Sequence, residues 1–168
     1  GQSCQVELGG ERVITGYVDD VEPRYSADEH QISTRGRDKT GDLIDCSVDL
    51  GVGENEIRNQ TIEQIARRLV APYGIEVVTE VDPGGRIPLT EILPEQTVMA
   101  VLQQLSGYAG VLLSSDAYGR LVITHAGAAA GGGVLERGRN ILAGSARHSL
   151  QQRYSKYVVQ ALAKGEEA

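Results

Sequence analysis

The chain has 168 residues and a formal net charge of −7 at pH 7, with 16 Lys and Arg against 23 Asp and Glu. This balance argues against a nucleic-acid-binding surface, because affinity for phosphate backbones comes chiefly from clustered Lys and Arg. The sequence contains neither Trp nor Phe. We therefore expect a core of Val, Ile, Leu and Ala, with tyrosines at its margins.

Residue types that bind metals or form disulfides are few. Cys4 and Cys46 lie in different segments without a CxxC pair, and the three histidines show no ligand spacing. We expect free, partly buried thiols and no catalytic residue, cofactor or metal site. No run of about 18 apolar residues and no charged-then-apolar leader occurs, so no membrane insertion is expected. The chain opens on Gly1 and has its only Met at position 99, which indicates a segment of a longer protein.

The first fifty residues are typical of strands. Cys4 to Leu8 alternates moderately, and the glycine pair after Leu8 would turn the chain. Arg12 to Val21 is rich in Val, Ile and Tyr, and in Glu29 to Arg35 the residues His30, Ile32 and Thr34 alternate with the others. These runs predict an antiparallel meander.

The stretch RGRDKTGDLIDCS, residues 35–47, carries three carboxylates, three cations and two glycines. Its DKTGD nearly matches the DKTGT phosphorylation loop of P-type ATPases, in which the first Asp takes a phosphoryl group. That chemistry needs magnesium-binding carboxylates and a nucleotide-binding region from elsewhere, and the chain has neither the length nor the motifs for them. An acid–base pair of Asp42 and Asp45 is a further alternative.

A structural turn explains more of this stretch. Gly36 and Gly41 would allow backbone turns, and Asp38 and Asp42 would cap a short helical turn. Leu43 and Ile44 would point into the core, while the carboxylates pair with the neighbouring cations. The residues of the predicted structural turn are Gly36, Arg37, Asp38, Gly41, Asp42, Leu43 and Asp45.

The next segment predicts a helix over Gln60 to Tyr73. Its apolar residues follow the i, i+3, i+4, i+7, i+8 spacing of one helical face, and Thr61 with Gln64 has capping-box spacing. Pro72 and Gly74 would end it. Ile75 to Val81 then alternates as a strand.

A second helix is predicted over Thr97 to Ser106, ending at Gly107, and strands over Val111 to Ser114 and Leu121 to Thr124 form a hairpin through residues 116–119. Thr61 and Thr97 begin two similar helix-strand units 36 positions apart. The sequence thus predicts a small module of two helix-strand units with pseudo-twofold character.

The remaining chain predicts a loop followed by more strands. Residues 127–133 are only Gly and Ala, which indicates a flexible loop. Asn140 to Ala143 and Tyr154 to Leu162 are strand-like. The predicted fold is α+β and mainly β: an antiparallel β-barrel-like domain from residues 1–50 and 134–168, with residues 51–126 inserted as the small α/β module.

Five segments in one order resemble a known family. They are GRDKTGDLIDCS, TIEQIARRLVAPYGIEV, LPEQTVMAVLQQLSGYAGVLLSSDAYGRLVIT, LERGRNIL and RYSKYVV, which begin at Gly36, Thr61, Leu93, Leu135 and Arg153. The chain resembles the baseplate hub protein of Mu-like contractile-tailed phages, the tail protein P family. This family is related to the late-control tail proteins (late-control protein D) and, more distantly, to the hub part of type VI secretion spikes.

The resemblance implies a structural protein of the virion tail baseplate, assembled in the host cytoplasm. It implies a homotrimer whose barrel-like domains join the sixfold tail tube to the threefold central spike. The implied partners are copies of the chain, tail tube protein, central spike protein and other baseplate proteins. The acidic charge agrees with a lumen through which DNA passes without specific binding.

Two other functions remain as alternatives. A tail-associated cell-wall hydrolase would need a catalytic set, and a peptidoglycan-binding module is suggested by the small helix-strand repeat. The absence of Trp and Phe disfavours the second, because such modules use aromatic platforms.

Overall fold

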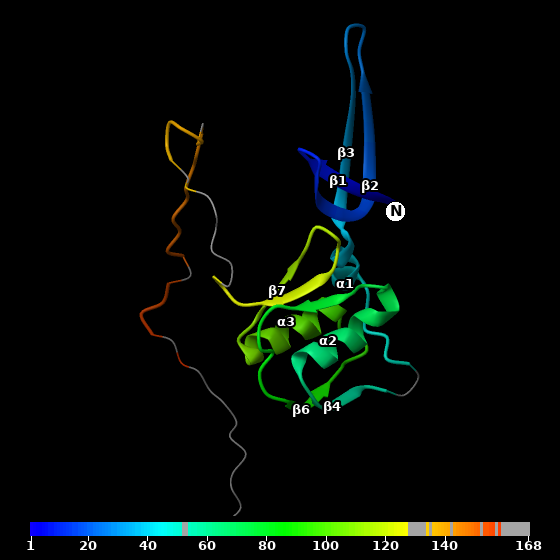
Figure 1. Ribbon diagram of the computed structural model, residues 1–168, viewed down its shortest axis with the longest axis vertical. Helices are drawn as coiled ribbons and strands as arrows, with labels where there is room; N and C mark the ends of the chain where they lie inside the picture. The colour runs from blue at the N-terminus through cyan, green and yellow to red at the C-terminus, as the bar shows by residue number, and fades with distance from the viewer. Residues whose placement is uncertain are drawn as a thin grey trace, which may run out of the picture. The chain divides into compact units, whose positions relative to one another are not determined.

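The computed structural model describes residues 1–51, 54–127, 134, 136–141, 143–151, 153–156 and 158. The chain divides into two compact units, Gly1–Ala130 and Gly131–Ala168. Every named helix and strand of the described residues belongs to the first unit (Figure 1). The class is α+β and mainly β, as the sequence predicted, with largely antiparallel sheets.

The first unit begins with a three-stranded antiparallel sheet. Its strands β1 (Gln2–Leu8), β2 (Glu11–Tyr25) and β3 (His30–Asp38) lie in the order β1-β2-β3, which confirms the predicted meander. β1 pairs with β2 only as far as Val18, so the rest of β2 and β3 extends as a two-stranded ribbon (Figure 1). β2 runs further than expected because Pro23 keeps its place in the ladder opposite Ile32, and β3 continues past Arg35 to Asp38 opposite Gly16.

A bulge in β2 decides which side chains share a face of this sheet. Val18 lies opposite Gly36, but Asp20 lies opposite Arg35, so Asp19 is an extra residue. The insertion returns Val21, Pro23 and Tyr25 to the face that carries Val18. One face of the sheet therefore carries a row of apolar residues into the ribbon, with Gln2, His30, Thr34 and Asp38 as its polar members: Cys4, Val6, Ile14, Val18, Val21, Pro23, Tyr25 and Ile32.

The rest of the first unit is the α/β module. After the short helices η1 (Lys39–Gly41) and α1 (Asp42–Asp45), it contains two successive strand-helix-strand units. The elements of these units and of the final strand are β4 (Glu56–Gln60), α2 (Ile62–Val70), η2 (Ala71–Tyr73), β5 (Val77–Thr79), β6 (Ile87–Glu91), α3 (Val98–Ala109), β7 (Leu112–Ser115) and β8 (Leu121–Thr124). β4 and β6 form an antiparallel pair, whereas β5, β8 and β7 form a second sheet in that order, with β5 parallel to β8.

The two predicted helices are confirmed, with the same start and stop signals. Thr61 caps α2 in a capping box with Gln64, and the Thr97 side chain accepts the Ala100 N–H at the start of α3. The helical segments end at Gly74 and Gly110, both in the left-handed region with φ of 62° and 69°. The expected end of the second helix at Gly107 is wrong, because α3 continues to Ala109.

β4 and β6 lack the pattern that predicts strands. β4 is a short polar run, and β6 contains Pro88, which normally disqualifies a central strand. Pro88 is tolerated because the ladder pairs neither it nor Asn59 opposite; Asn59 has a φ of 53°, and its carbonyl accepts a hydrogen bond from the Arg86 side chain instead. Tertiary pairing here overrides local propensity.

The core lies entirely in the module and is aliphatic, as predicted. Among the described residues, no buried hydrophobic side chain comes from β1, β2 or β3. Tyr73 packs at the margin of the core. The cluster consists of Leu43, Ile57, Ile62, Ile65, Ala66, Leu69, Val70, Ile75, Val77, Ile87, Ile92, Val98, Val101, Leu102, Leu105, Val111, Leu121 and Ile123.

Three expectations concern the end of the chain. The strand expected over Asn140 to Ala143 is wrong for its described residues, because Asn140 closes a turn onto Glu136 and Ile141 makes one isolated bridge to Arg137. Of the strand expected over Tyr154 to Leu162, only residues 154–156 and 158 are described, and they form no strand. The Gly/Ala loop lies outside the described residues except for Gly127.

Three further expectations concern the barrel, the two cysteines and membrane-spanning helices. The sheets of the described residues are open, so they form no closed barrel. Cys4 and Cys46 are both free and half-buried, as predicted. Within the described part of the chain, no helix is long and apolar enough to cross a membrane.

The helix end at Gly110 predicts opposite effects for two neighbouring glycines. Gly110→Ala should destabilise the protein by about 1 kcal/mol, since its left-handed backbone resists a side chain. Gly107→Ala lies inside α3 with open space around its Cβ position, and should stabilise it by about 0.5–1 kcal/mol. Urea unfolding measures both changes. Equal effects in the two variants would contradict the assigned end of α3.

Candidate functional site

The predicted turn lies where the chain leaves the β1–β3 sheet and enters the module. Gly36, Arg37 and Asp38 are the last residues of β3, Gly41 ends η1, and Asp42 to Asp45 form α1. We call residues 36–47 the junction. It gathers contacts from the sheet, from both helix-strand units and from its own two short helices.

Arg37 is surrounded by three carboxylates. Its guanidinium donates a hydrogen bond to Asp45 and lies 3.5 Å from Asp19 and 3.6 Å from Asp42. The hydrogen bond to Asp45 and the charge of Asp19 raise the pKa of Arg37, against a smaller opposing effect of burial. Asp19 is the bulge residue of β2, whereas Asp42 and Asp45 belong to α1. One side chain therefore connects the sheet to the first helix of the module.

The two glycines of the junction have a different role from the one expected. Neither Gly36 nor Gly41 has a positive φ, so the expectation that they allow special turns is wrong. A Cβ at Gly41 would lie 2.9 Å from Cδ of Arg37, and a Cβ at Gly36 would lie 2.4 Å from the carbonyl oxygen of Tyr17. Both glycines are required by close packing, and Gly41 specifically leaves room for Arg37.

The remaining junction residues match their expected roles in part. Asp38 caps η1: its Oδ1 accepts hydrogen bonds from the N–H and hydroxyl of Thr40, each at 2.8 Å. Asp42 was also expected to cap, but its carboxylate faces Arg37 instead. Leu43 is fully buried as expected. Ile44, expected in the core, is 59% exposed, because a single helical turn presents only one residue inward.

Further contacts connect the junction to the ends of both module helices. Lys39 Nζ donates a hydrogen bond of 2.6 Å to the Gly74 carbonyl, at the end of the α2–η2 segment. The Tyr73 hydroxyl donates to the Ser47 carbonyl at 2.6 Å, and burial raises the pKa of Tyr73. The Cys46 carbonyl accepts the Val98 N–H at the start of α3. Lysine is a residue type that can bind helix-end carbonyls, but nothing in the sequence indicates that the partner of Lys39 is the Gly74 carbonyl.

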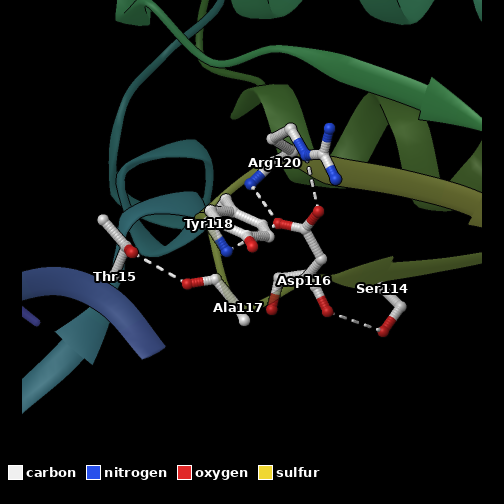
Figure 2. A network of polar contacts seen from close by, with 7 residues as sticks. Thr15, Ser114, Asp116, Ala117, Tyr118 and Arg120 are labelled. Carbon is white, nitrogen blue, oxygen red and sulfur yellow. Dashed lines mark hydrogen bonds and ion pairs between the residues drawn. The ribbon is translucent and has the colours of Figure 1, made fainter. Parts of the chain in front are cut away.

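A second contact between sheet and module involves the β7–β8 hairpin (Figure 2). Thr15 of β2 donates a hydrogen bond of 2.8 Å to the carbonyl of Ala117 in the hairpin loop. The ring of Tyr118 lies under two guanidinium groups, with Arg12 Cζ 5.5 Å and Arg120 Cζ 5.3 Å from its centroid. From the sequence this loop is predictable only as a hairpin turn, because nothing local marks Thr15 or Arg12 as its partners.

Asp116 organises that loop from within. Its Oδ1 accepts the N–H groups of Tyr118 and Arg120 at 2.9 and 3.0 Å, and its Oδ2 accepts Arg120 Nε at 2.6 Å (Figure 2). Burial raises the pKa of Asp116, but the hydrogen bonds from Arg120 and Tyr118 outweigh it, so the net pKa lies below its ordinary value of 3.8. The charged carboxylate of Asp116 therefore fixes the conformation of the loop whose Ala117 carbonyl accepts the hydrogen bond from Thr15.

The polar side chains of the junction and of the β7–β8 hairpin loop hold the sheet and the module together. The carboxylates of the junction face Arg37 or cap N–H groups, which leaves them engaged with the protein itself. Among the described residues, no group of three or more His, Cys, Asp or Glu side chains could hold a metal ion. The arrangement is that of a structural joint between a sheet and an α/β module.

The fold and the junction define the class of the protein: it is a structural protein built of two joined parts. Residues 1–38 match the Mu phage baseplate assembly protein GpP-like N-terminal domain, and residues 40–125 match the second domain of gp44-like baseplate hub proteins. The chain therefore belongs to the Mu-like baseplate hub family of phage tail proteins, which are structural proteins and not enzymes. The boundary between the two matches falls at Lys39, inside the junction.

Three relatives illustrate the similarity. The chain is 36% identical over 167 residues to the baseplate hub protein gp44 of Escherichia phage Mu, covering 98% of this chain and 43% of that protein. A prophage MuSo2 tail protein of 43 kDa from Shewanella oneidensis has 45% identity and a TM-score of 0.83, covering 93% and 48% of the two chains. A tail protein from Neisseria meningitidis has 28% identity and a TM-score of 0.65, with coverages of 72% and 36%. The chain spans less than half the length of these relatives.

The lowered pKa of Asp116 predicts an acid-dependent loss of stability. A carboxylate with a lowered folded-state pKa contributes stability above its ordinary value of 3.8, and this contribution is lost as the pH falls through the folded pKa. Asp116→Asn should cost about 1–2 kcal/mol at pH 7, with a smaller difference from the wild type near pH 3. Urea unfolding at both pH values measures it.

Asp82→Asn is the matched control, because the exposed Asp82 accepts only the Gly84 N–H. Its cost should stay within about 0.5 kcal/mol. An Asp116→Asn cost that does not change between pH 7 and pH 3 would contradict the charged role of Asp116.

Proposed function

We propose that the chain is part of a baseplate hub that trimerises and joins the sixfold tail tube to the threefold central spike. The observation that carries the proposal is the collinear pair of family domains, residues 1–38 and 40–125, joined by the Arg37 junction. A component that connects tube and spike must transmit force between its parts. A fixed junction between sheet and module suits that requirement.

The uncovered apolar face of the β1–β3 sheet supports this proposal. Val6 and Ile14 on that face are 42% and 40% exposed, and the β1 and β3 edges each have a strand on only one side. Exposed contiguous apolar surface marks an interaction site. We propose that residues 1–50 and 134–168 together make a barrel-like hub domain, with residues 51–126 as the inserted module and residues 127–133 as the connecting loop.

The ribbon of β2 and β3, residues 19–35, suits contact with another copy of the chain. Val21, Tyr25 and Ile32 on its apolar face are 60%, 80% and 73% exposed. An isolated two-stranded ribbon is at best marginally stable in water. Packing of this face against a neighbouring subunit would stabilise the ribbon and would assemble the homotrimer.

The charge of the chain suits a channel through which DNA slides. The ribbon carries Asp19, Asp20, Glu22, Asp28 and Glu29 against Arg24 and Arg35. Acidic side chains along a lumen repel phosphates, so DNA would pass without specific binding. The proposed location is the tail baseplate of a virion, assembled in the host cytoplasm, with tube, spike and other baseplate proteins as partners.

Analytical ultracentrifugation of the full-length protein tests the proposal. At tens of micromolar, the protein should sediment as a trimer, because the apolar ribbon face needs a partner. Ile32→Glu should shift the population towards monomer by at least about tenfold in the association constant, equivalent to about 1.4 kcal/mol.

Gln31→Glu is the control, since it adds the same charge at the next residue, on the polar face of the ribbon. It should leave the trimer intact. A wild-type protein that is monomeric at this concentration would contradict the proposal.

A further inference from the structure

The strand β6 has an open edge next to helix α3. In its two-stranded sheet, β6 pairs only with β4. The Ile92 N–H donates to the Asn55 carbonyl at 2.8 Å, which makes these two residues a hydrogen-bonded pair. Since such pairs alternate in an antiparallel ladder, Thr90 also faces β4, and the backbone groups of Leu89 and Glu91 face outward.

A groove of about 490 Å³ lies along this edge. Leu89 and Leu93 contribute one wall, and Val101 and Leu105 of α3 contribute the other. Leu89 and Leu93 are 38% and 52% exposed. An edge strand beside an apolar helix face is the geometry in which a protein accepts an added strand, because main-chain bonds give affinity and the groove accepts alternate side chains.

Two polar features of the groove lack partners. The Thr90 side chain lines the groove and is 6% exposed, and its hydroxyl has no hydrogen-bond partner among the described residues. Glu91 lies directly opposite Glu56 in the ladder, and like charges at such positions destabilise a sheet. Glu56 pairs with Arg58, whereas Glu91 makes no ion pair within the described part of the chain.

We propose that β6 is completed by an extended segment of another baseplate protein, one that places a Lys or Arg beside Glu91 and an apolar side chain in the groove. The inference rests on the proposed function, because it takes the chain to be part of a baseplate. The charge of Glu91 indicates which kind of segment would bind at this edge. A second copy that paired its own β6 edge here would bring a second Glu91 to the same edge, so the edge favours a Lys- or Arg-containing segment of a different protein.

Few features of β6 would block the pairing of another strand at its open edge. Natural proteins blunt open edges with charges, proline or bulges. Pro88 lies opposite Asn59, so its missing N–H is on the β4 side of the strand, and Glu91 is the one charge in the sequence IPLTE. The outward edge thus keeps the N–H groups of Leu89 and Glu91 available.

Photo-crosslinking in assembled baseplates tests the inference. p-Benzoylphenylalanine is introduced at position 93 of the full-length protein, and crosslinked peptides are identified by mass spectrometry. The expected product joins position 93 to a Lys- or Arg-containing segment of another baseplate protein. The same label at position 112 is the control, because Leu112 is also 52% exposed but lies on β7. It should not give that product.

Two variants at position 89 separate the backbone from the side chain. Leu89→Pro removes the outward N–H and should reduce the crosslink at least tenfold, and an edge strand tolerates proline with its N–H side facing solvent. Leu89→Ala keeps the N–H and should retain most of the crosslink. Thermal unfolding of both variants shows whether they fold.

Each other outcome has a definite meaning. A crosslink from position 93 to a second copy of this chain, or none in baseplates that contain the protein, overturns the inference while the proposed function stands. Absence of the protein from purified baseplates would overturn the proposed function itself.

Discussion

The placement of Arg37 among three aspartates is the interaction on which the arrangement of sheet and module depends. The sheet contributes no buried hydrophobic side chain to the core of the described residues, so apolar packing does not fix it in place. Polar contacts do so instead: Arg37 with Asp42 and Asp45, Thr15 with Ala117, and the ring of Tyr118 with Arg12. Gly41 is part of the same constraint, because any larger residue would displace the Arg37 side chain.

The two parts of the first unit are stabilised differently, and this difference relates structure to function. The module buries a complete aliphatic core between its strands and the helices α2 and α3. The sheet instead leaves a largely apolar face exposed, and the bulge at Asp19 maintains that face into the ribbon. A module with its own core beside a sheet with an exposed apolar face suits an assembly protein, because such a face can bind other proteins.

Local signals made much of this fold predictable. The capping box at Thr61, the apolar stripes of both helices and the strand-forming runs of the first fifty residues all correspond to structure. β6 was missed because Pro88 normally disqualifies a strand, and the gap in the ladder opposite Asn59 that accommodates it is visible only in three dimensions. The roles of Gly36 and Gly41 were likewise hidden, since packing against Tyr17 and Arg37 has no signature in sequence.

Hydrogen exchange of Arg37→Gln tests the central role of the junction most directly, with Arg35→Gln as its control. Arg35 lies on the same strand but is 83% exposed and has one loose contact with Asp20 at 3.9 Å. In Arg37→Gln, amides of β2 and β3 near the junction should exchange several-fold faster, while those of α2 and α3 keep their wild-type rates. Arg35→Gln should change neither set. Equal exchange of the sheet amides in the two variants would contradict the account.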